Sequence, residues 1–434
     1  MNTNLKLAKT NTGKLYVNEK FAGVLNKNIG SNVFIPFADF YLLYSRLPRD
    51  HDEVIYAVKD GGRSAILPKE VEYNGKKYHI GVKGVGTYGT LEIAYKDKEI
   101  NEKLNEYKSK LPNKYDQGED YLITSEKGNI KVGANRPLGG QNLDLALWDL
   151  EFSKKLDKDL VYPGTDARFV PTIGVAEYND KLDKIISKTY SRDHYEGKVV
   201  QEYRLLPSTV ELTDFLYKDE YKQKRLNICK DEKKWSNLEK SLLAISLLPL
   251  NTIDPKTRDH LRPVHDPLNS SMAAESVIDT KDGTVYWKDL DNLAFDKFTS
   301  NDTPEQRTYL AMDKTINEIQ AAINDLTAAR IDIDKNPINA LERVLKDING
   351  IKIGNTQIYV KEPTKEKLDN RRYKYKYEIR LNTKDDELKE IKIPLMTYVD
   401  TSTGNVTTGY QDPLFPHGVE YYSSGGGWKT PKPL

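Results

Sequence analysis

Cysteine is almost absent from this sequence. Its 434 residues include a single cysteine, Cys229, so no internal disulfide can form. The longest apolar run, near Leu242–Leu250, is far shorter than the roughly 20 residues that a membrane-spanning helix needs. Met1–Lys20 is polar throughout and has no apolar core of the kind found in a signal peptide. We therefore expect a cytoplasmic protein without membrane contact.

An excess of charge of either sign is also missing. The chain has 66 basic and 65 acidic residues, which gives a net charge of +1. Phosphate backbones are bound by regions with a basic excess, so this balance argues against a nucleic-acid partner. The most basic run, Arg371–Lys376, alternates basic and aromatic residues, which indicates the solvated face of a strand more than an RNA contact.

Motifs for several common chemistries are lacking as well. Six histidines and one cysteine form no ligand-spaced group, which argues against a zinc site, and no Gly-x-Ser-x-Gly occurs. Hydrophobic residues make up 38% of the chain and charged residues 30%, as in folded globular proteins. The length predicts two or three packed units.

The first half of the chain reads as strands with one helix among them. Apolar alternation predicts strands at 52–59, 64–67, 71–73 and 77–82. Asn74-Gly75 predicts a hairpin turn between the last two of these strands. Leu145, Trp148 and Phe152 recur at helical spacing, which predicts an amphipathic helix over 143–156. Further strands are predicted at 169–178 and 198–206.

The second half is helical until the chain returns to strands. Ser208 and Glu211 have the spacing of a capping box and predict a helix through Leu216. Other apolar stripes predict helices at 235–248 and around Ile319 and Leu341, a hairpin at 277–287, and strands at 351–400. Strands and helices occur in blocks, which indicates an α+β fold and not alternating βαβ units.

These blocks suggest four segments. We expect an N-terminal extension at 1–50 and a sheet-rich lobe at 51–206, with a charged insertion near 98–130. A helical lobe at 207–350 and a strand-rich appendage with a tail at 351–434 would follow.

The predicted sheet-rich lobe contains residue types suited to binding a nucleotide. Lys83 ends an apolar strand and precedes Gly84 and Gly86, where a backbone could approach phosphate closely. Phosphoryl transfer needs such a lysine and a carboxylate to hold it, and Glu151 on the 143–156 helix is a candidate. A surface lysine before a glycine-rich turn, and a solvated glutamate, are the alternative interpretations.

The same chain also has residues that could bind a divalent metal and an adenine. Asp289 and Asp291 follow a strand and could bind a divalent metal, or simply form an acidic loop. Glu202 and Tyr203 lie in a strand that runs toward a helix. Their main-chain groups could face an adenine, or the segment could be an ordinary strand–helix corner.

The order of these motifs resembles the protein-kinase-like fold, and most closely the selenoprotein O family of kinase-like protein adenylyltransferases. Val82–Thr87 is similar to that family's lysine motif, and Glu151–Leu156 with Val170-Pro171-Thr172 is similar to its helix and following strand. Arg136 lies near the position of an arginine that the family has before this helix. Gln201–Leu206 resembles the hinge between lobes, and Asp289-Leu290-Asp291 occupies the place of the metal-binding motif. The similarity covers about half the chain.

The resemblance implies a two-lobed fold that binds ATP and Mg²⁺, with Lys83 facing Asp289 across a cleft. A phosphoryl or adenylyl group would be transferred to a hydroxyl of a protein or small molecule. Kinases, however, carry a His-Arg-Asp loop, and an asparagine 13 residues before the metal aspartate, where this chain has Ser276. Glu275 or Asp266 could be the base and Ser276 a metal ligand. A catalytically inactive nucleotide-binding scaffold, and a non-enzymatic interaction protein with tyrosine-rich strands, remain the alternatives.

Overall fold

The computed structural model describes residues 4–49, 53–60, 64–85, 98, 102–103, 106, 109, 141–181, 183–184, 198–263, 272–290, 293–295, 303–385, 388–410, 420–422 and 428–429. The chain divides into two compact units. Unit 1 comprises Met1–Leu156 and Val170–Thr209, and unit 2 comprises Asp157–Phe169 and Val210–Leu434. Both units combine helices with antiparallel strands, as the α+β prediction requires.

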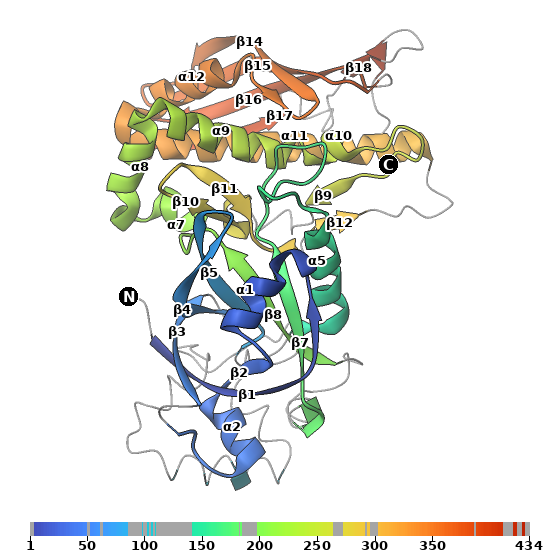
Figure 1. The fold of residues 1–434 in the computed structure, drawn as a ribbon. Coiled ribbons are helices and arrows are strands. Elements are labelled where there is room, and N and C mark those ends of the chain that lie inside the picture. Colours follow the sequence, from blue (N-terminus) through green and yellow to red (C-terminus); the bar gives the residue numbers. More distant parts are fainter. Residues whose placement is uncertain are drawn as a thin grey trace. The chain divides into compact units, whose positions relative to one another are not determined.

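Unit 1 is built on an eight-stranded antiparallel sheet (Figure 1). Its strands are β1 (Asn4–Val17), β2 (Asn32–Pro36), β3 (Val54–Asp60), β4 (Ser64–Tyr73), β5 (Lys76–Lys83), β6 (Gln141–Asn142), β7 (Thr172–Tyr178) and β8 (Val199–Leu206). The first half of β1 pairs with β3 and its second half with β7. The strands β1, β3, β4, β5, β8 and β7 therefore form a closed ring, in which each strand is paired with the next and β7 is paired with β1. The segment predicted as an N-terminal extension thus supplies two strands of this sheet.

The turn between β4 and β5 forms as the sequence predicts. Tyr73 pairs with Lys76, which leaves a two-residue connection. Asn74 has a φ of 50° and Gly75 a φ of 74°. Two left-handed residues define the type I′ turn, whose twist matches the paired strands, and Asn-Gly is its preferred sequence.

Among the described residues, three α-helices accompany the sheet of unit 1: α1 (Ala22–Asn28), α2 (Phe37–Tyr44) and α5 (Leu143–Lys155), with a short 3₁₀ turn η1 (Glu19–Phe21). The Asn142 side chain caps α5 by accepting from the amides of Asp144 and Leu145. Ala146 and Leu150 of α5 pack on Val175 of β7 and Val200 of β8.

Helix α5 is where the sequence predicts it, but the side of the helix that is buried differs from the predicted side. Leu145 was expected to face the core and is 38% exposed, whereas Asp149 is 0% exposed. The side of α5 that contacts β7 and β8 carries the buried residues Ala146, Asp149, Leu150 and Ser153. A charged side chain can occupy that stripe because Arg204 lies next to it.

The helices of unit 2 are α7 (Leu212–Tyr217), α8 (Lys222–Lys230), α9 (Glu232–Ser246), α10 (Leu248–Thr252), α11 (Pro304–Asp334) and α12 (Pro337–Ile348), with 3₁₀ turns η3 (Asp219–Tyr221) and η4 (Met272–Glu275). The predicted helices around 235–248, Ile319 and Leu341 are confirmed as α9, α11 and α12. The predicted start of α7 at Ser208 is wrong. Glu211 is its N-cap and makes no side-chain capping bond, so the capping-box spacing at Ser208 is not used.

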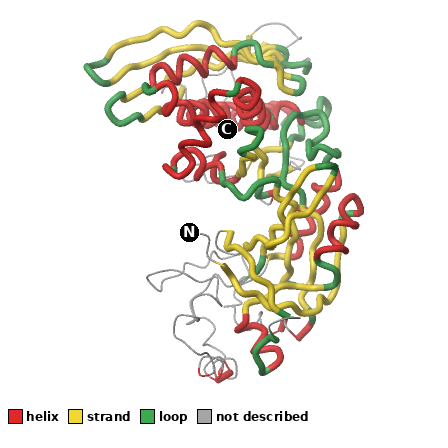
Figure 2. The backbone as a smooth tube through the Cα atoms, turned by 60° about the vertical axis from the view of Figure 1, so that its left-hand side comes forward, coloured by secondary structure: helices red, strands yellow, loops and turns green. Residues whose placement is uncertain are grey.

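The strands of unit 2 form one large sheet and two small pairs. The small pairs are β9 (Leu261–Pro263) with β12 (Leu293–Phe295), and the predicted hairpin of β10 (Ser276–Asp279) with β11 (Thr284–Trp287). The large sheet contains β13 (Lys352–Ile353), β14 (Thr356–Lys367), β15 (Arg372–Asn382), β16 (Glu390–Asp400), β17 (Asn405–Tyr410), β18 (Glu420–Tyr422) and β19 (Trp428–Lys429). Helices α11 and α12 lie against one face of this sheet (Figures 1 and 2).

The strands predicted at 351–400 are therefore part of a packed layer. The strand residues Tyr375, Ile379 and Ile393 are buried. None of the helices in the described ranges is long and apolar enough to cross a membrane. Most of the insertion expected near 98–130 lies outside the described residues.

A candidate phosphate-binding site around Lys83

A group of enclosed charged side chains lies at the end of β5. Lys83 is 5% exposed, and in the β5–β8 ladder it stands directly opposite Glu202, which is 0% exposed. Residues paired in an antiparallel ladder point to the same face of the sheet, so the two side chains are neighbours. A carboxylate buried to this degree is costly unless positive charge compensates it, and Lys83 is one source of that charge.

Arg204 and Thr172 complete the surroundings of Glu202. Arg204 Nε donates to Glu202 Oε1 at 2.7 Å, and the Thr172 hydroxyl donates to the same oxygen at 2.6 Å. Burial by itself would raise the pKa of Glu202, but Arg204 and Lys83 outweigh it and bring that pKa below its usual value. Glu202 is therefore ionised at neutral pH.

A second buried carboxylate reaches Arg204 from the helix. Asp149 of α5 lies with Oδ2 at 3.7 Å from Arg204 Nη2. Lys83, Glu202, Arg204 and Asp149 together form a group of two basic and two acidic side chains, which we call the Lys83 cluster. The opposite charges of neighbouring members lower the cost of burying them.

The backbone bends immediately after Lys83. Gly84 has a φ of 92°, a conformation that is open to glycine and strained for other residues. The Tyr178 hydroxyl donates to the Gly84 carbonyl at 2.6 Å and fixes the bend. The predicted glycine at this position thus has a structural requirement, and its partner in the motif, Gly86, lies outside the described residues.

Glu151, the carboxylate expected to hold Lys83, lies elsewhere on α5. Its side chain is 65% exposed and forms an ion pair with Lys154 of the same helix. Two residues along a helix correspond to a rotation of about 200°, so Glu151 and Asp149 project in nearly opposite directions. The structure brings Lys83 together with Glu202 and leaves Glu151 in solvent.

Tyr203 is buried in the sheet. It is 0% exposed, its hydroxyl donates to the Asn32 carbonyl at 2.7 Å, and burial raises its pKa well above the usual value. Glu202 and Tyr203 are paired with β5 on one side and with β7 on the other. Their main-chain groups are used by the sheet, so they are not available to an adenine in this arrangement.

The predicted metal and base residues that can be placed belong to unit 2. Ser276 opens β10 and is 0% exposed, and its hydroxyl makes no hydrogen bond within the described chain. The Glu275 carbonyl accepts from the Lys288 amide at 2.7 Å, and the Asp289 carbonyl accepts from Trp287 Nε1 at 2.8 Å. These contacts hold the main chain on either side of the β10–β11 hairpin.

The remaining expected residues, Asp266, Asp291 and Arg136, lie outside the described residues. In the part of the chain that is described, no three histidine, cysteine, aspartate or glutamate side chains gather as a set of metal ligands.

Sequence reasoning did not select Asp149, Arg204 or Thr172. A signal for Asp149 was present, because it lies four residues after Leu145 and three before Phe152, on the stripe that predicted the helix. Arg204 shares a strand face with Glu202 by simple alternation. Thr172 comes from β7, and nothing local in the sequence connects it to Glu202.

Comparison of the chain with protein-family models, with curated proteins and with solved structures found no match.

Proposed function

We propose that unit 1 binds ATP through Lys83, and that the protein is a kinase-like enzyme that transfers a phosphoryl or adenylyl group to a hydroxyl of a protein or small molecule. The observation that carries the proposal is the pairing of Lys83 with Glu202 on adjacent strands. In protein kinases, a lysine on the third strand of an antiparallel sheet contacts the phosphates, and a glutamate holds it. Here Lys83 ends the third strand of the consecutive series β3, β4 and β5, and helix α5 follows along the chain.

One feature of the proposed site differs from kinases. The carboxylate that holds the kinase lysine belongs to the helix after the third strand, whereas Glu202 belongs to β8. Glu202 is fixed by Arg204 and Thr172 as well as by Lys83. The lysine would thus be held by the sheet itself.

The basic side chains of the Lys83 cluster lie beside carboxylates, so the phosphates of ATP would need further positive charge near them. Mg²⁺ supplies that charge in kinases, and the resemblance implies it here. Mg²⁺ is bound by one or two carboxylates together with phosphate oxygens, and Asp289 is the expected carboxylate that the structure describes. Its partner in the motif, Asp291, lies outside the described residues.

A catalytically inactive ATP-binding protein is the second candidate. Ser276 occupies the position where kinases have a metal-binding asparagine, and it is fully buried at the start of β10. Mg²⁺ keeps several of its waters when bound, which a fully buried hydroxyl cannot accommodate. Unless Glu275 or Asp266 supplies the missing function, ATP would bind without group transfer.

Thermal unfolding with and without Mg²⁺·ATP tests the binding step. A ligand at 100 times its Kd stabilises the folded state by about 2.7 kcal/mol, so wild type should melt at a higher temperature in millimolar ATP. Lys83→Ala should lose this shift. The variant should still fold, because Arg204 continues to compensate Glu202. Circular dichroism would verify this.

Lys77→Ala is the matched control. Lys77 lies on the same strand, and its side chain is 69% exposed in a surface ion pair with Glu70. It should keep the full ATP shift. A shift of equal size in wild type and Lys83→Ala, or no shift in wild type, would refute the site.

Labelled ATP then separates the two candidates. Transfer of the γ-label indicates phosphorylation and transfer of the α-label indicates adenylylation. If ATP binds but neither label is transferred to protein or small-molecule hydroxyls, the inactive scaffold is the correct interpretation.

A further inference from the structure

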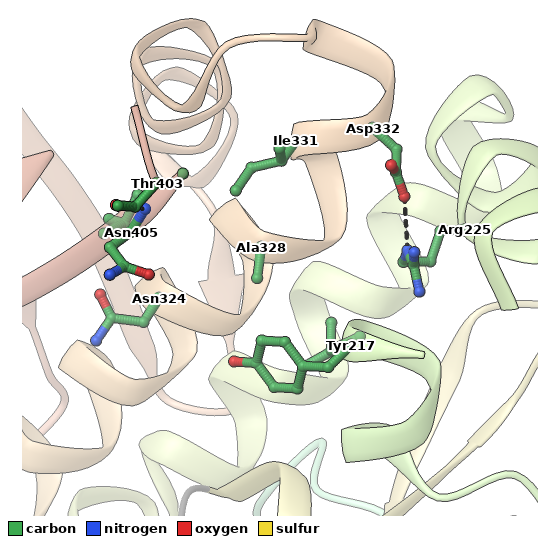
Figure 3. A pocket seen from close by; sticks show the side chains of 11 residues that line it. Tyr217, Arg225, Asn324, Ala328, Ile331, Asp332, Thr403 and Asn405 are labelled. Carbon is green, nitrogen blue, oxygen red and sulfur yellow. Dashed lines mark hydrogen bonds and ion pairs between the residues drawn. The ribbon is translucent and has the colours of Figure 1, made fainter. Parts of the chain in front are cut away.

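A pocket of about 340 Å³ opens within unit 2, among α7, α8, α11 and the turn between β16 and β17 (Figure 3). Its volume lies at the lower end of the range for small-molecule sites. The middle of the pocket is apolar, with Ala328 and Ile331 of α11 on one side and Tyr217 of α7 on the other. Polar side chains occupy its two ends.

An arginine–aspartate pair forms one end. Arg225 is 4% exposed, and its Nε donates to Asp332 Oδ2 at 2.8 Å. Arg225 Nη1 donates to the carbonyls of Phe215 and Lys218, which fixes the guanidinium. Nη2 makes no hydrogen bond to the chain within the described residues, so this end offers donors at Nη2 and an acceptor at Asp332.

Two amides form the other end. Asn324 Oδ1 accepts from the Thr408 amide at 3.1 Å and from the Thr408 hydroxyl at 2.8 Å. Because a main-chain N–H can only donate, the side-chain atom of Asn324 that faces the Thr408 amide must be the oxygen. The Nδ2 group of Asn324 can therefore donate to a ligand. Asn405, the first residue of β17, lies beside it and directly follows the turn after β16 (Figure 3). That turn is held by Asp400, whose carbonyl accepts from the Gly404 amide at 2.9 Å.

Tyr217 provides an exposed aromatic surface between these ends. The residue is 61% exposed, and burial of its hydroxyl end together with the nearby Asp325 raises its pKa. A ring that is enclosed at its hydroxyl end and uncovered elsewhere is a stacking surface that costs little entropy to use.

The charges discriminate among ligand classes. Asp332 pairs with both Arg225 and Lys222, whose Nζ lies 3.5 Å from its Oδ1. Both cations therefore already have a carboxylate beside them, and an anionic ligand would be placed against that carboxylate. An apolar ligand would leave Arg225 Nη2 and Asn324 Nδ2 unsatisfied. A hydroxyl both donates and accepts, and so it fits an arginine–aspartate pair at one end and amides at the other.

We propose that this pocket binds a saccharide ring, with the C–H face of the sugar stacked on Tyr217 and its hydroxyls bound by Arg225, Asp332, Asn324 and Asn405. The site lies entirely within unit 2 and does not depend on ATP binding at Lys83. It would give the protein a carbohydrate ligand or a glycosylated partner.

Saturation-transfer difference NMR on the full chain tests the proposal, with free glucose, galactose, mannose and N-acetylglucosamine at millimolar concentration as probes. At least one should receive saturation through its ring protons. Tyr217→Ala should weaken that binding by about tenfold, because it removes the stacking surface. Asn405→Ala, an exposed residue whose side chain makes no hydrogen bond within the described chain, should also weaken it.

Tyr359→Ala is the control, since Tyr359 is 37% exposed on β14 and does not line the pocket. It should bind the sugar as wild type does. Benzoate and adenosine serve as probes for an anion with a flat body and for a nucleobase. No saturation of any saccharide, saturation that survives both Tyr217→Ala and Asn405→Ala, or Tyr217-dependent binding of benzoate or adenosine without a saccharide would overturn the proposal.

Discussion

Glu239 gives unit 2 a dependence on pH that can be predicted in sign and size. It lies on the inner face of α9 and is 3% exposed. Burial, with Asp347 of α12 as a further negative charge, raises its pKa from 4.5 to about 8, despite the opposing influence of Trp235 and Arg330. The folded protein therefore keeps Glu239 protonated at pH values where the unfolded chain has released the proton.

The sign of the effect follows from proton binding. Between about pH 4.5 and pH 8 the folded state holds one more proton than the unfolded state at this residue. Stability then falls as pH rises, by about 1.4 kcal/mol for each pH unit. By the time the pH exceeds the folded-state pKa, the free energy of unfolding should have dropped by about 3–5 kcal/mol relative to acidic conditions.

Glu239→Gln keeps the shape of the protonated side chain and cannot ionise. At about pH 5 it should match wild type within about 1 kcal/mol, and at about pH 9 it should be more stable by about 3–5 kcal/mol. Urea denaturation followed by circular dichroism across this range measures the difference. Burial also raises the pKa of Asp325, to about 7. The resulting loss of stability with rising pH occurs in both proteins and cancels in the comparison.

Glu232→Gln is the control, because Glu232 is exposed in the first turn of the same helix. Its stability curve should follow that of wild type at every pH. If wild type and Glu239→Gln lose stability in parallel as the pH rises, Glu239 is not protonated in the folded protein at neutral pH, and its raised pKa is refuted.

Two pairs of substitutions test a tight backbone contact and a buried ion pair of unit 2 by the same urea assay. Gly283→Ala should cost about 2–4 kcal/mol, because φ is 82° and a Cβ would lie 2.3 Å from the Lys234 carbonyl oxygen. Gly350→Ala, with φ at 85° and open space around the Cβ position, should cost only about 1 kcal/mol, and equal costs would contradict the steric argument. Arg258→Met should cost about 3–5 kcal/mol, because it leaves Asp385 enclosed without the guanidinium that contacts it at 2.7 Å. The double variant with Asp385→Asn should recover part of that loss, and no recovery would refute the role of charge.

Much of the fold could be predicted because its signals are local. Asn74-Gly75 determines a turn through its own backbone preferences, and the helical stripe through Leu341 lies within one element. The closure of the unit 1 sheet depends instead on β1, which pairs with β3 and with β7. Such pairings are long-range, and nothing in the sequence of 1–50 states which strands it will join.

The candidate site shows the same division. Lys83 could be selected from its strand and the glycine after it. Its carboxylate partner could not, because Glu202 becomes a neighbour only when β5 and β8 pair. Both the position of Glu151 beside the apolar stripe and the resemblance selected Glu151, whereas the buried carboxylate of α5 is Asp149.

The identity of that partner changes how Lys83 could be controlled. In kinases the ion pair joins a strand to a movable helix, so displacing the helix breaks it. Glu202 lies in the middle of a sheet, hydrogen-bonded to Arg204 and Thr172, and stays beside Lys83 whatever α5 does. Within the described residues, the helix reaches the Lys83 cluster through Asp149, which lies 3.7 Å from Arg204, and through Ser153 Oγ, which accepts from the Thr172 amide at 2.8 Å. A movement of α5 would therefore unbalance the charges of the cluster without removing the carboxylate from the lysine, so it would adjust affinity for an anion and not abolish it.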